Sequence, residues 1–445
     1  MTEFADVLPQ LKGKDVYMYL SKENPDWVGL DVEVELVLHY GGKKVSLSLA
    51  DDENASYLAS SLYHFIDENS LVICWGVKDL FTYLKGRTEI SLEICDRLYD
   101  ISIMCSYFGF SMERPSTFKE AAQTLRMAMS EPSWGNFREF YRSVYRPLFS
   151  KVVPDMETNC LIDNARRKCV YPTYVIEGQA NGRLKAIKSG SSSYNPHSIG
   201  ANEKANLRPK DYDEVFVYFD YKNMEVNVLQ WLSKDETLAE MLVTGKDLYK
   251  EIWRKITLQS PTESHRSLCK DIFLPVVFGQ GARSLSKKLG IAEEIASKLI
   301  YKLNKTFPVA FGWVNSQSTD SNNTATDVFG RKRTFEDQKQ YKIKNFCIQS
   351  PASMICLKKL VRLHEVFASK ASICFHVHDG YCVLCNKNEV NFVYELGTSV
   401  LEEEDPMFPG LDLKTTCNFG HSLNDMQNIT KGAQREDNSR FVSGH

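Results

Sequence analysis

The sequence of 445 residues has no hydrophobic run that approaches the ~20 apolar residues of a membrane-spanning helix. Its charge is nearly balanced, with 54 Lys and Arg against 57 Asp and Glu. Without an overall basic excess, nucleic-acid binding would need local basic patches. Residues 1–6 are not a basic segment leading into an apolar one, so we expect no secretion signal and a cytoplasmic location.

The 12 cysteines are scattered, and the only closely spaced pair is Cys382 and Cys385. No second pair or histidines follow at zinc-ligand spacing, so we interpret this pair as part of an apolar strand. Isolated cysteines are typical of a reducing compartment. With 43% hydrophobic and 25% charged residues, the composition indicates a globular protein of roughly three domains and excludes global disorder.

The first hundred residues alternate between strand and helix patterns. Residues 27–38 and 45–49 are rich in β-formers on either side of a Gly41-Gly42 turn, 56–66 has a helical pattern, and 70–74 is strand-like. This alternation predicts a small α/β layer domain. Three further stretches are expected to be mainly helical: 107–163, 236–307 and 348–368. Polar loops are expected at 189–196 and 316–323, and a disordered tail from 428.

Two apolar strands each end at an aspartate. Val215–Phe219 runs into Asp220, and Ile373–His378 runs into Asp379 at the turn of a predicted hairpin. A buried carboxylate needs a partner, and two carboxylates on one sheet would suit Mg²⁺. The alternative is two unrelated turn aspartates, which the spacing alone favours.

Between these strands, four residues recur at intervals of four and would share one face of a helix: Arg266, Lys270, Leu274 and Phe278. Two cations above two apolar groups could bind a triphosphate and stack on a base. An amphipathic surface helix explains the same spacing, but not its position between the two aspartate strands.

These three segments, in this order, resemble motifs A, B and C of the family A (Pol I-like) DNA polymerases, above all the short phage-encoded members. Motif A is 220–225, motif B is Arg-x3-Lys-x7-Phe-Gly from Arg266, and motif C is 376–379. The resemblance covers roughly 170–427. Because three motifs occur in order, it is specific.

The resemblance implies a mixed α/β (α+β) fold: a right-hand polymerase palm and fingers with a reduced thumb, preceded by an RNase H-like 3′–5′ exonuclease-type domain. We expect the following division: 1–110 an exonuclease-like α/β domain, either intact or degenerate, 111–175 helical connector or reduced thumb, 176–235 first palm part, 236–310 fingers, 311–427 second palm part and 428–445 tail.

The resemblance also assigns roles near the reacting groups. Asp220, Asp379 and the carbonyl of Tyr221 would hold two Mg²⁺ ions, with Mn²⁺ as an expected substitute. Arg266 and Lys270 would grip the triphosphate, and Lys270 would protonate the leaving pyrophosphate. Three residues would contact the nucleotide or its base pair: Leu274, Phe278, and Glu225 as the gate against a ribose 2′-hydroxyl.

For DNA, Arg183 in Asn181-Gly182-Arg183-Leu184 corresponds to the arginine that touches the primer terminus. Further DNA contacts are expected from Asn345, Gln349, His378, Arg331 and Arg333, the last two in a basic Gly-Arg-Lys-Arg turn. These cations would supply the phosphate affinity that the net charge does not.

The sequence departs from the family pattern at several positions. Gly380 stands where many members have Glu, His376 where Gln is frequent, and Leu274 where an aromatic residue is frequent. Pro275 follows inside the predicted fingers helix and is expected to kink it.

The exonuclease motifs are incomplete. Asp31 and Glu33 match the first Asp-x-Glu motif, Asp79 loosely matches the second, and Asp100 stands in a later element. The last motif has Tyr145 where an aspartate is required. Two-metal hydrolysis needs the whole acidic cluster, so the sequence leaves proofreading open.

The implied activity is template-directed addition of dNTPs to a primer 3′-hydroxyl by two-metal phosphoryl transfer, in phage DNA replication. The expected partners are primer–template DNA, dNTPs and replisome proteins (helicase-primase, single-strand binding protein, processivity factor), with no membrane. Three alternatives stay open: a single-subunit RNA polymerase, a DNA-binding nuclease or relic polymerase without synthesis, and a plain metal-binding α/β protein. Glu225 speaks against the first, and the four intact residues Asp220, Asp379, Arg266 and Lys270 against the second.

Overall fold

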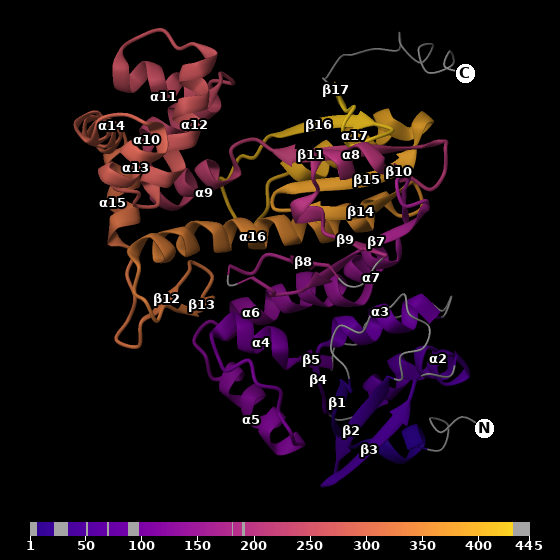
Figure 1. Ribbon diagram of the computed structural model, residues 1–445. Helices are drawn as coiled ribbons and strands as arrows, with labels where there is room; N and C mark the ends of the chain where they lie inside the picture. Colours follow the sequence, from indigo (N-terminus) through magenta and orange to yellow (C-terminus); the bar gives the residue numbers. More distant parts are fainter. Residues whose placement is uncertain are drawn as a thin grey trace.

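The computed structural model describes residues 7–21, 34–49, 52–68, 71–87, 98–179, 181–188 and 192–429. The expected Asp31, Glu33 and most of the 428–445 tail lie outside these residues. The described residues form three five-stranded sheets and one two-stranded sheet. Figure 1 shows the long helix α16 (Gln340–Phe367) running between the N-terminal part of the chain and the C-terminal sheet.

The N-terminal domain is an α/β sheet, as its alternating pattern predicts. Its strands follow the order β3-β2-β1-β4-β5, with β1 antiparallel to β2 and parallel to β4. The strands are β1 (Asp15–Leu20), β2 (Glu35–Tyr40), β3 (Lys43–Ser48), β4 (Leu71–Trp75) and β5 (Leu98–Asp100). Its helices are η1 (Leu8–Leu11), α2 (Asp52–Glu68), α3 (Val77–Arg87) and α4 (Ile101–Phe108). The exonuclease assignment of this domain stays a prediction.

A helical connector follows, where the sequence predicts helix. It comprises α5 (Phe118–Met129), α6 (Trp134–Phe140), the π-helical turns η2 (Tyr141–Tyr145) and η3 (Leu148–Val152), and α7 (Val153–Thr158). Large aromatic side chains of this connector, Phe137, Phe140, Tyr141, Tyr145 and Phe149, are fully buried. They form core between the domains rather than a surface for stacking bases.

A second sheet has the order β10-β6-β7-β8 with β9 beside β7. Figure 1 shows its strands β7, β8 and β9 below α16. Its elements are β6 (Leu161–Asp163), β7 (Lys168–Val175), β8 (Lys185–Ile187), β9 (Ser193–Tyr194), η4 (Pro196–Ser198), α8 (Ala201–Asn206) and β10 (Leu207–Pro209).

The central sheet has the order β14-β15-β11-β16-β17 and is antiparallel throughout. Its strands are β11 (Glu214–Tyr221), β14 (Ala371–Val377), β15 (Gly380–Asn386), β16 (Thr415–Gly420) and β17 (Gln427–Ile429). The hairpin β14–β15 forms where the sequence predicts it, and Cys382 and Cys385 are buried in β15. The sheet packs against α16 and α17 (Val390–Glu402), which follows the short η5 (Lys387–Glu389).

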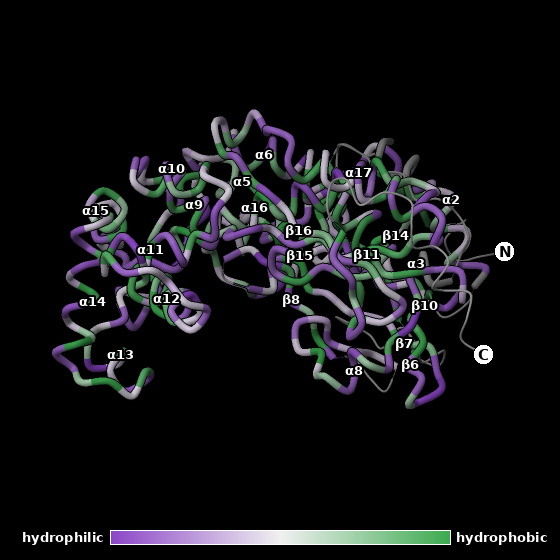
Figure 2. The backbone as a smooth tube through the Cα atoms, turned by 90° about the horizontal axis from the view of Figure 1, so that it is seen from above, coloured by the Kyte–Doolittle hydropathy of each residue, from purple (hydrophilic) through white to green (hydrophobic). Residues whose placement is uncertain are grey.

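The helix α9 (Met224–Ser233) leaves the central sheet and leads to a separate helical group. This group comprises α10 (Glu236–Val243), α11 (Leu248–Thr257), α12 (Glu263–Val277), α13 (Ala282–Leu289), α14 (Glu293–Thr306) and α15 (Pro308–Ser316). A small hairpin, β12 (Thr324–Thr326) and β13 (Lys332–Thr334), returns the chain to α16. In Figure 2, α12–α14 at one end and α8 with β6 and β7 at the other project to the same side. No described helix has both the length and the apolar composition needed to cross a membrane.

Candidate nucleotidyl-transfer site

Asp220 and Asp379 meet at one edge of the central sheet. Asp220 lies near the end of β11, and its Cα pairs with that of Gly380, the first residue of β15. Asp379 occupies the turn just before Gly380. The strand pairing therefore places the two carboxylates side by side, although they lie far apart in the chain. From the sequence, Asp220 and Asp379 were expected to lie close together only if their two strands are neighbours in one sheet.

Both carboxylates have a raised pKa. Burial, together with the negative charge of Asp379, raises the pKa of Asp220 to about 6, and Lys270 opposes this shift. Burial likewise raises the pKa of Asp379. Two carboxylates that lie close together favour a bound cation. Their oxygens are hard ligands, which Mg²⁺ and Mn²⁺ prefer. The residues present therefore fit the expected metal, with the neighbouring carbonyl of Tyr221 available as a further donor.

Tyr218 explains why Gly380 replaces the frequent glutamate. A Cβ atom at Gly380 would lie 2.0 Å from the hydroxyl oxygen of Tyr218, so no larger side chain fits unless Tyr218 moves. The phenol of Tyr218 thus occupies the space beside the two aspartates. The sequence did not single out Tyr218, because it reads there as one more aromatic residue of an apolar strand.

Helix α12 carries three of the four residues expected to face the nucleotide, and the fourth, Phe278, directly follows its last residue. Lys270 is exposed, whereas Leu274 and Phe278 are half-buried against the helical group. Lys270 is close enough to Asp220 to lower its pKa, so this face of α12 looks toward the carboxylates. Arg266 is held by Asp247, whose Oδ2 lies 2.5 Å from the Nε of Arg266. Asp247 also caps α11 by accepting a hydrogen bond from the amide of Lys250.

The helix continues through Pro275 and ends at Val277. Proline cannot donate to the carbonyl four residues earlier, which is that of Asp271. Lys288 supplies the missing donor, since its Nζ lies 2.9 Å from the Asp271 carbonyl oxygen. A side chain from α13 thus compensates for the proline near the end of α12.

A cluster of four polar side chains joins the start of α9 to the primer-binding turn expected at 181–184. Oε1 of Glu225 accepts hydrogen bonds from Arg183 (3.2 Å) and from Gln349 (3.0 Å). Gln349 in turn accepts from Asn181 at 3.2 Å. We call Asn181, Arg183, Glu225 and Gln349 the gate cluster. The structure thus brings together the residues predicted separately for the primer and for the sugar.

Histidines line the other side of Asp379. The ring of His378 stacks on that of His197, with centroids 5.2 Å apart, and His378 has a left-handed backbone conformation (φ 55°). His376 is buried and bonded through Nδ1 to the carbonyl of Gly380. Burial lowers the pKa of His197 to about 4 and that of His376 to about 3, so both are neutral at pH 7. His197 was not anticipated from the sequence.

The other expected DNA contacts differ in accessibility. Asn345, half-buried on α16, has an Oδ1 without a hydrogen-bond partner among the described residues. Arg333 lies over the ring of Phe335 at 4.7 Å and lines a cleft of about 550 Å³ between the N-terminal domain and the β12–β13 hairpin.

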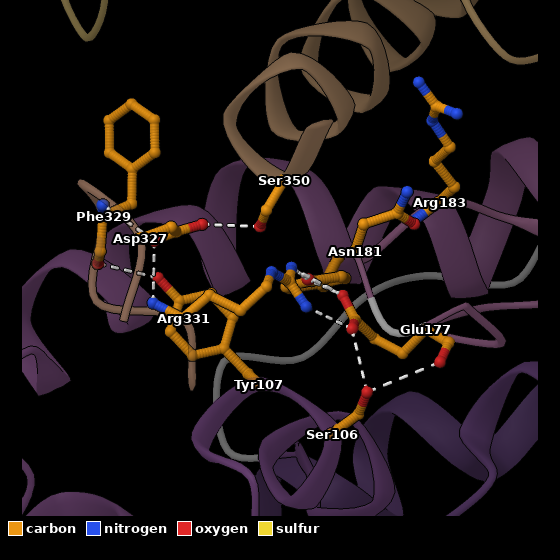
Figure 3. A network of polar contacts seen from close by, with 10 residues as sticks. Ser106, Tyr107, Glu177, Asn181, Arg183, Asp327, Phe329, Arg331 and Ser350 are labelled. Atoms are coloured by element: carbon orange, nitrogen blue, oxygen red, sulfur yellow. Dashed lines mark hydrogen bonds and ion pairs between the residues drawn. The ribbon is translucent and has the colours of Figure 1, made fainter. Parts of the chain in front are cut away.

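The expectation that Arg331 contacts DNA is wrong for this structure. Its side chain is 1% exposed, and Glu177 binds its guanidinium (Figure 3). Arg331 also donates to the hydroxyl of Tyr145. A buried guanidinium with these partners cannot also reach a phosphate at the surface. The sequence misled because Gly-Arg-Lys-Arg reads as an exposed basic turn, and Glu177 lies 154 residues away.

The exonuclease candidates do not form an acidic cluster in the described part of the chain. Asp79 is ion-paired with Lys78 at 2.7 Å, and Asp100 caps α4 by accepting from the amide and hydroxyl of Ser102. Strand β1, the centre of the sheet, has five buried residues after Asp15, none of them acidic. Among the described residues, no group of three or more His, Cys, Asp or Glu side chains is placed to hold a metal ion.

The comparisons with known proteins agree with this geometry. The sequence profile of DNA polymerase family A matches residues 119–425. The chain is 25% identical over 210 residues to a DNA polymerase of Mycobacterium phage D29, covering 45% of this chain and 34% of the phage protein. It is 25% identical over 251 residues to DNA polymerase I of Chloroflexus aurantiacus, covering 51% of this chain and 26% of that protein. Over 217 residues it is 24% identical to the thermostable DNA polymerase I of Thermus aquaticus, covering 45% and 26%.

Because the profile covers more than half of its residues, the chain belongs to DNA polymerase family A. The recognition made from the three motifs is thereby confirmed. The alignments span only 34%, 26% and 26% of the three relatives, so these relatives are much longer than the part they share with this chain.

Proposed function

We propose that this protein is a template-directed DNA polymerase that adds dNTPs to the 3′-hydroxyl of a primer. One observation carries the proposal: in a family A chain, strand pairing puts Asp220 beside Asp379, and the Lys270 face of α12 looks toward them. Without Asp220, Asp379 or Lys270, the site would lack a metal ligand or a cation for the triphosphate. The names of the relatives, all DNA polymerases, support the substrate class.

In the proposed reaction, the chain's own residues position and neutralise charge. Asp220, Asp379 and the carbonyl of Tyr221 would hold two Mg²⁺ ions, which supply Lewis-acid activation of the attacking hydroxyl and charge neutralisation at the triphosphate. Arg266 and Lys270 would bind the β- and γ-phosphates, as cations on a preorganised helix face do. The exposed ammonium of Lys270 is a proton donor for the departing pyrophosphate.

Glu225 is the residue we assign to sugar selection. Its carboxylate lies in the gate cluster, where Arg183 and Gln349 fix its orientation. A carboxylate held in one place would leave no room for a 2′-hydroxyl, which favours a DNA polymerase over an RNA polymerase. Phage DNA replication, primer–template DNA and the replisome partners named above belong to the same proposal.

Single-nucleotide extension of a labelled primer tests the proposal. On four templates that differ at the first unpaired base, the wild type should add the complementary dNTP and reject the other three. Lys270→Ala should lower kcat/KM by about 10²–10³-fold, the usual cost of one transition-state cation. Lys298→Ala, an exposed lysine on α14, is the matched control and should extend normally. Tight primer binding without extension on any template would instead favour a relic polymerase.

A further inference from the structure

The buried guanidinium of Arg331 is the centre of a network that joins four distant segments (Figure 3). Its two Nη atoms contact both carboxylate oxygens of Glu177, and Nη2 also donates to the hydroxyl of Tyr145 at 2.6 Å. The ring of Tyr107 lies 4.7 Å from its Cζ. Ser106 donates to Glu177 at 3.0 Å.

These partners come from separate parts of the chain. Tyr107 and Ser106 lie on α4 of the N-terminal domain, Tyr145 in the connector turn η2, and Glu177 just after β7. Arg331 itself lies between β12 and β13, on a loop that Asp327 fixes by accepting from the Arg331 amide at 2.9 Å and from Ser350 of α16 at 2.5 Å. The Arg331–Glu177 ion pair and its partners therefore link the N-terminal domain and α16 to the segment that follows β7.

The network also forms the surface on which the primer-binding turn rests. Gly182 has a left-handed backbone (φ 79°), and a Cβ there would lie 2.6 Å from Cζ of Arg331. The turn thus packs its glycine directly on the guanidinium. On either side of this glycine stand Asn181 and Arg183, two members of the gate cluster.

We propose that the Arg331–Glu177 ion pair is a positioning element that sets the 181–183 turn and, through it, the orientation of Glu225. This inference rests on the proposed polymerase function and goes beyond it. It gives Arg331 a role other than DNA contact, and it gives the N-terminal domain a role that needs no nuclease chemistry. Ser106 and Tyr107 connect that domain to the gate.

The Arg331–Glu177 ion pair contributes a fixed geometry rather than stability. A buried ion pair is weak evidence for stability, because desolvation offsets much of its attraction and apolar replacements are frequently tolerated. Its two-pronged geometry nevertheless fixes the direction of the guanidinium plane. Gly182 packs against that plane, which fixes its position. An apolar side chain at position 331, with free torsions, would not fix it.

The test compares the double variant Arg331→Met/Glu177→Gln with the wild type. It removes both charges together, and the amide oxygen introduced at position 177 can still accept from Ser106. We expect the ratio of kcat/KM for dNTP to that for rNTP to fall about tenfold, within the range found for residues that act through others. In an Arg183→Ala background, the double variant should cause no further fall. Gly182→Ala perturbs the same contact from the other side without touching a charge, and should lower the ratio as well.

Lys78→Met/Glu157→Gln is the matched control, because it removes another buried ion pair, one that joins α3 to α7. It should lower the melting temperature without changing the nucleotide ratio. An unchanged ratio in both the Arg331/Glu177 and Gly182 variants would overturn the inference, as would an equal fall in the control. If the double variant does not fold, Arg331→Lys, which keeps a charge but loses the two-pronged contact with Glu177, replaces it and should lower the ratio.

Hydrogen exchange separates this inference from the proposed function. The amides of 181–184 should exchange faster in the Arg331/Glu177 variant than in the wild type, and not in the Lys78/Glu157 control. This result is expected whether or not the protein extends primers. Equal exchange in all three proteins would overturn the positioning role even if polymerase activity is found.

Discussion

Removing the charge of Asp220 should make the metal-free protein more stable. Asp220 has a pKa of about 6 instead of the ordinary 3.8, because it is largely buried beside Asp379. At 1.36 kcal/mol per pH unit, this difference of about 2 corresponds to about 3 kcal/mol. Water reaches the partly exposed carboxylate, which reduces the expected gain from Asp220→Asn to about 1–2 kcal/mol. For a chain of 445 residues, that gain corresponds to a melting temperature higher by about 1–2 °C.

The pH dependence follows from the sign of the shift. Because the pKa is higher in the folded state, folding takes up a proton between pH 3.8 and about 6, and stability falls as the pH rises through this window. The loss of folding stability caused by ionised Asp220 is complete above about pH 6 and vanishes below pH 3.8. Asp220→Asn should therefore gain more at about pH 7.5 than at about pH 4.5.

Thermal unfolding in EDTA, followed by circular dichroism at both pH values, measures this gain. Asp235→Asn is the control: Asp235 is also buried, but its two oxygens accept from the amides of Leu238 and Ala310. The control should lose stability, since an amide cannot accept both bonds. If Asp220→Asn melts at or below the wild-type temperature at the higher pH, or gains equally at both pH values, the charge of Asp220 does not destabilise the folded protein.

Three further outcomes concern the nucleotide side of the site. Leu274→Tyr should raise dideoxynucleotide incorporation relative to dNTP severalfold, because a tyrosine there would pack on the sugar; an unchanged ratio in competition gels would exclude this. Asp247→Asn should lower the KM for dNTP by up to about fivefold, the value of a partly exposed ion pair, because Asp247 competes with the triphosphate for Arg266; a higher KM would show that Asp247 orients Arg266 instead. Glu225→Ala should raise rNTP incorporation at least tenfold, and the absence of any increase would remove the gate role.

Much of the polymerase part could be predicted because its signals are local. Apolar strands that end in Asp220 and Asp379, and a four-residue spacing from Arg266 to Phe278, are visible in short windows of sequence. The hairpin β14–β15, the helical group and the mixed α/β class followed from the same patterns. The pairing of β11 with β15 could not be predicted from the sequence and is seen only in the structure.

What the sequence missed depends on contacts between distant segments. The burial of Arg331 needs Glu177, Tyr145 and Tyr107, three residues with no local relation to the basic turn. Tyr218 matters because it fills the space at Gly380. Asp247 reads as an ordinary helix cap until the fold places Arg266 beside it.

The central claim is tested most directly by primer extension with Mg²⁺ and all four dNTPs, comparing the wild type with Asp379→Asn. We predict full extension by the wild type and a loss of at least about 10³-fold in the variant, while both proteins bind the primer–template equally well and melt cooperatively. Extension by Asp379→Asn at the wild-type rate would contradict the assignment of the two carboxylates as the catalytic pair.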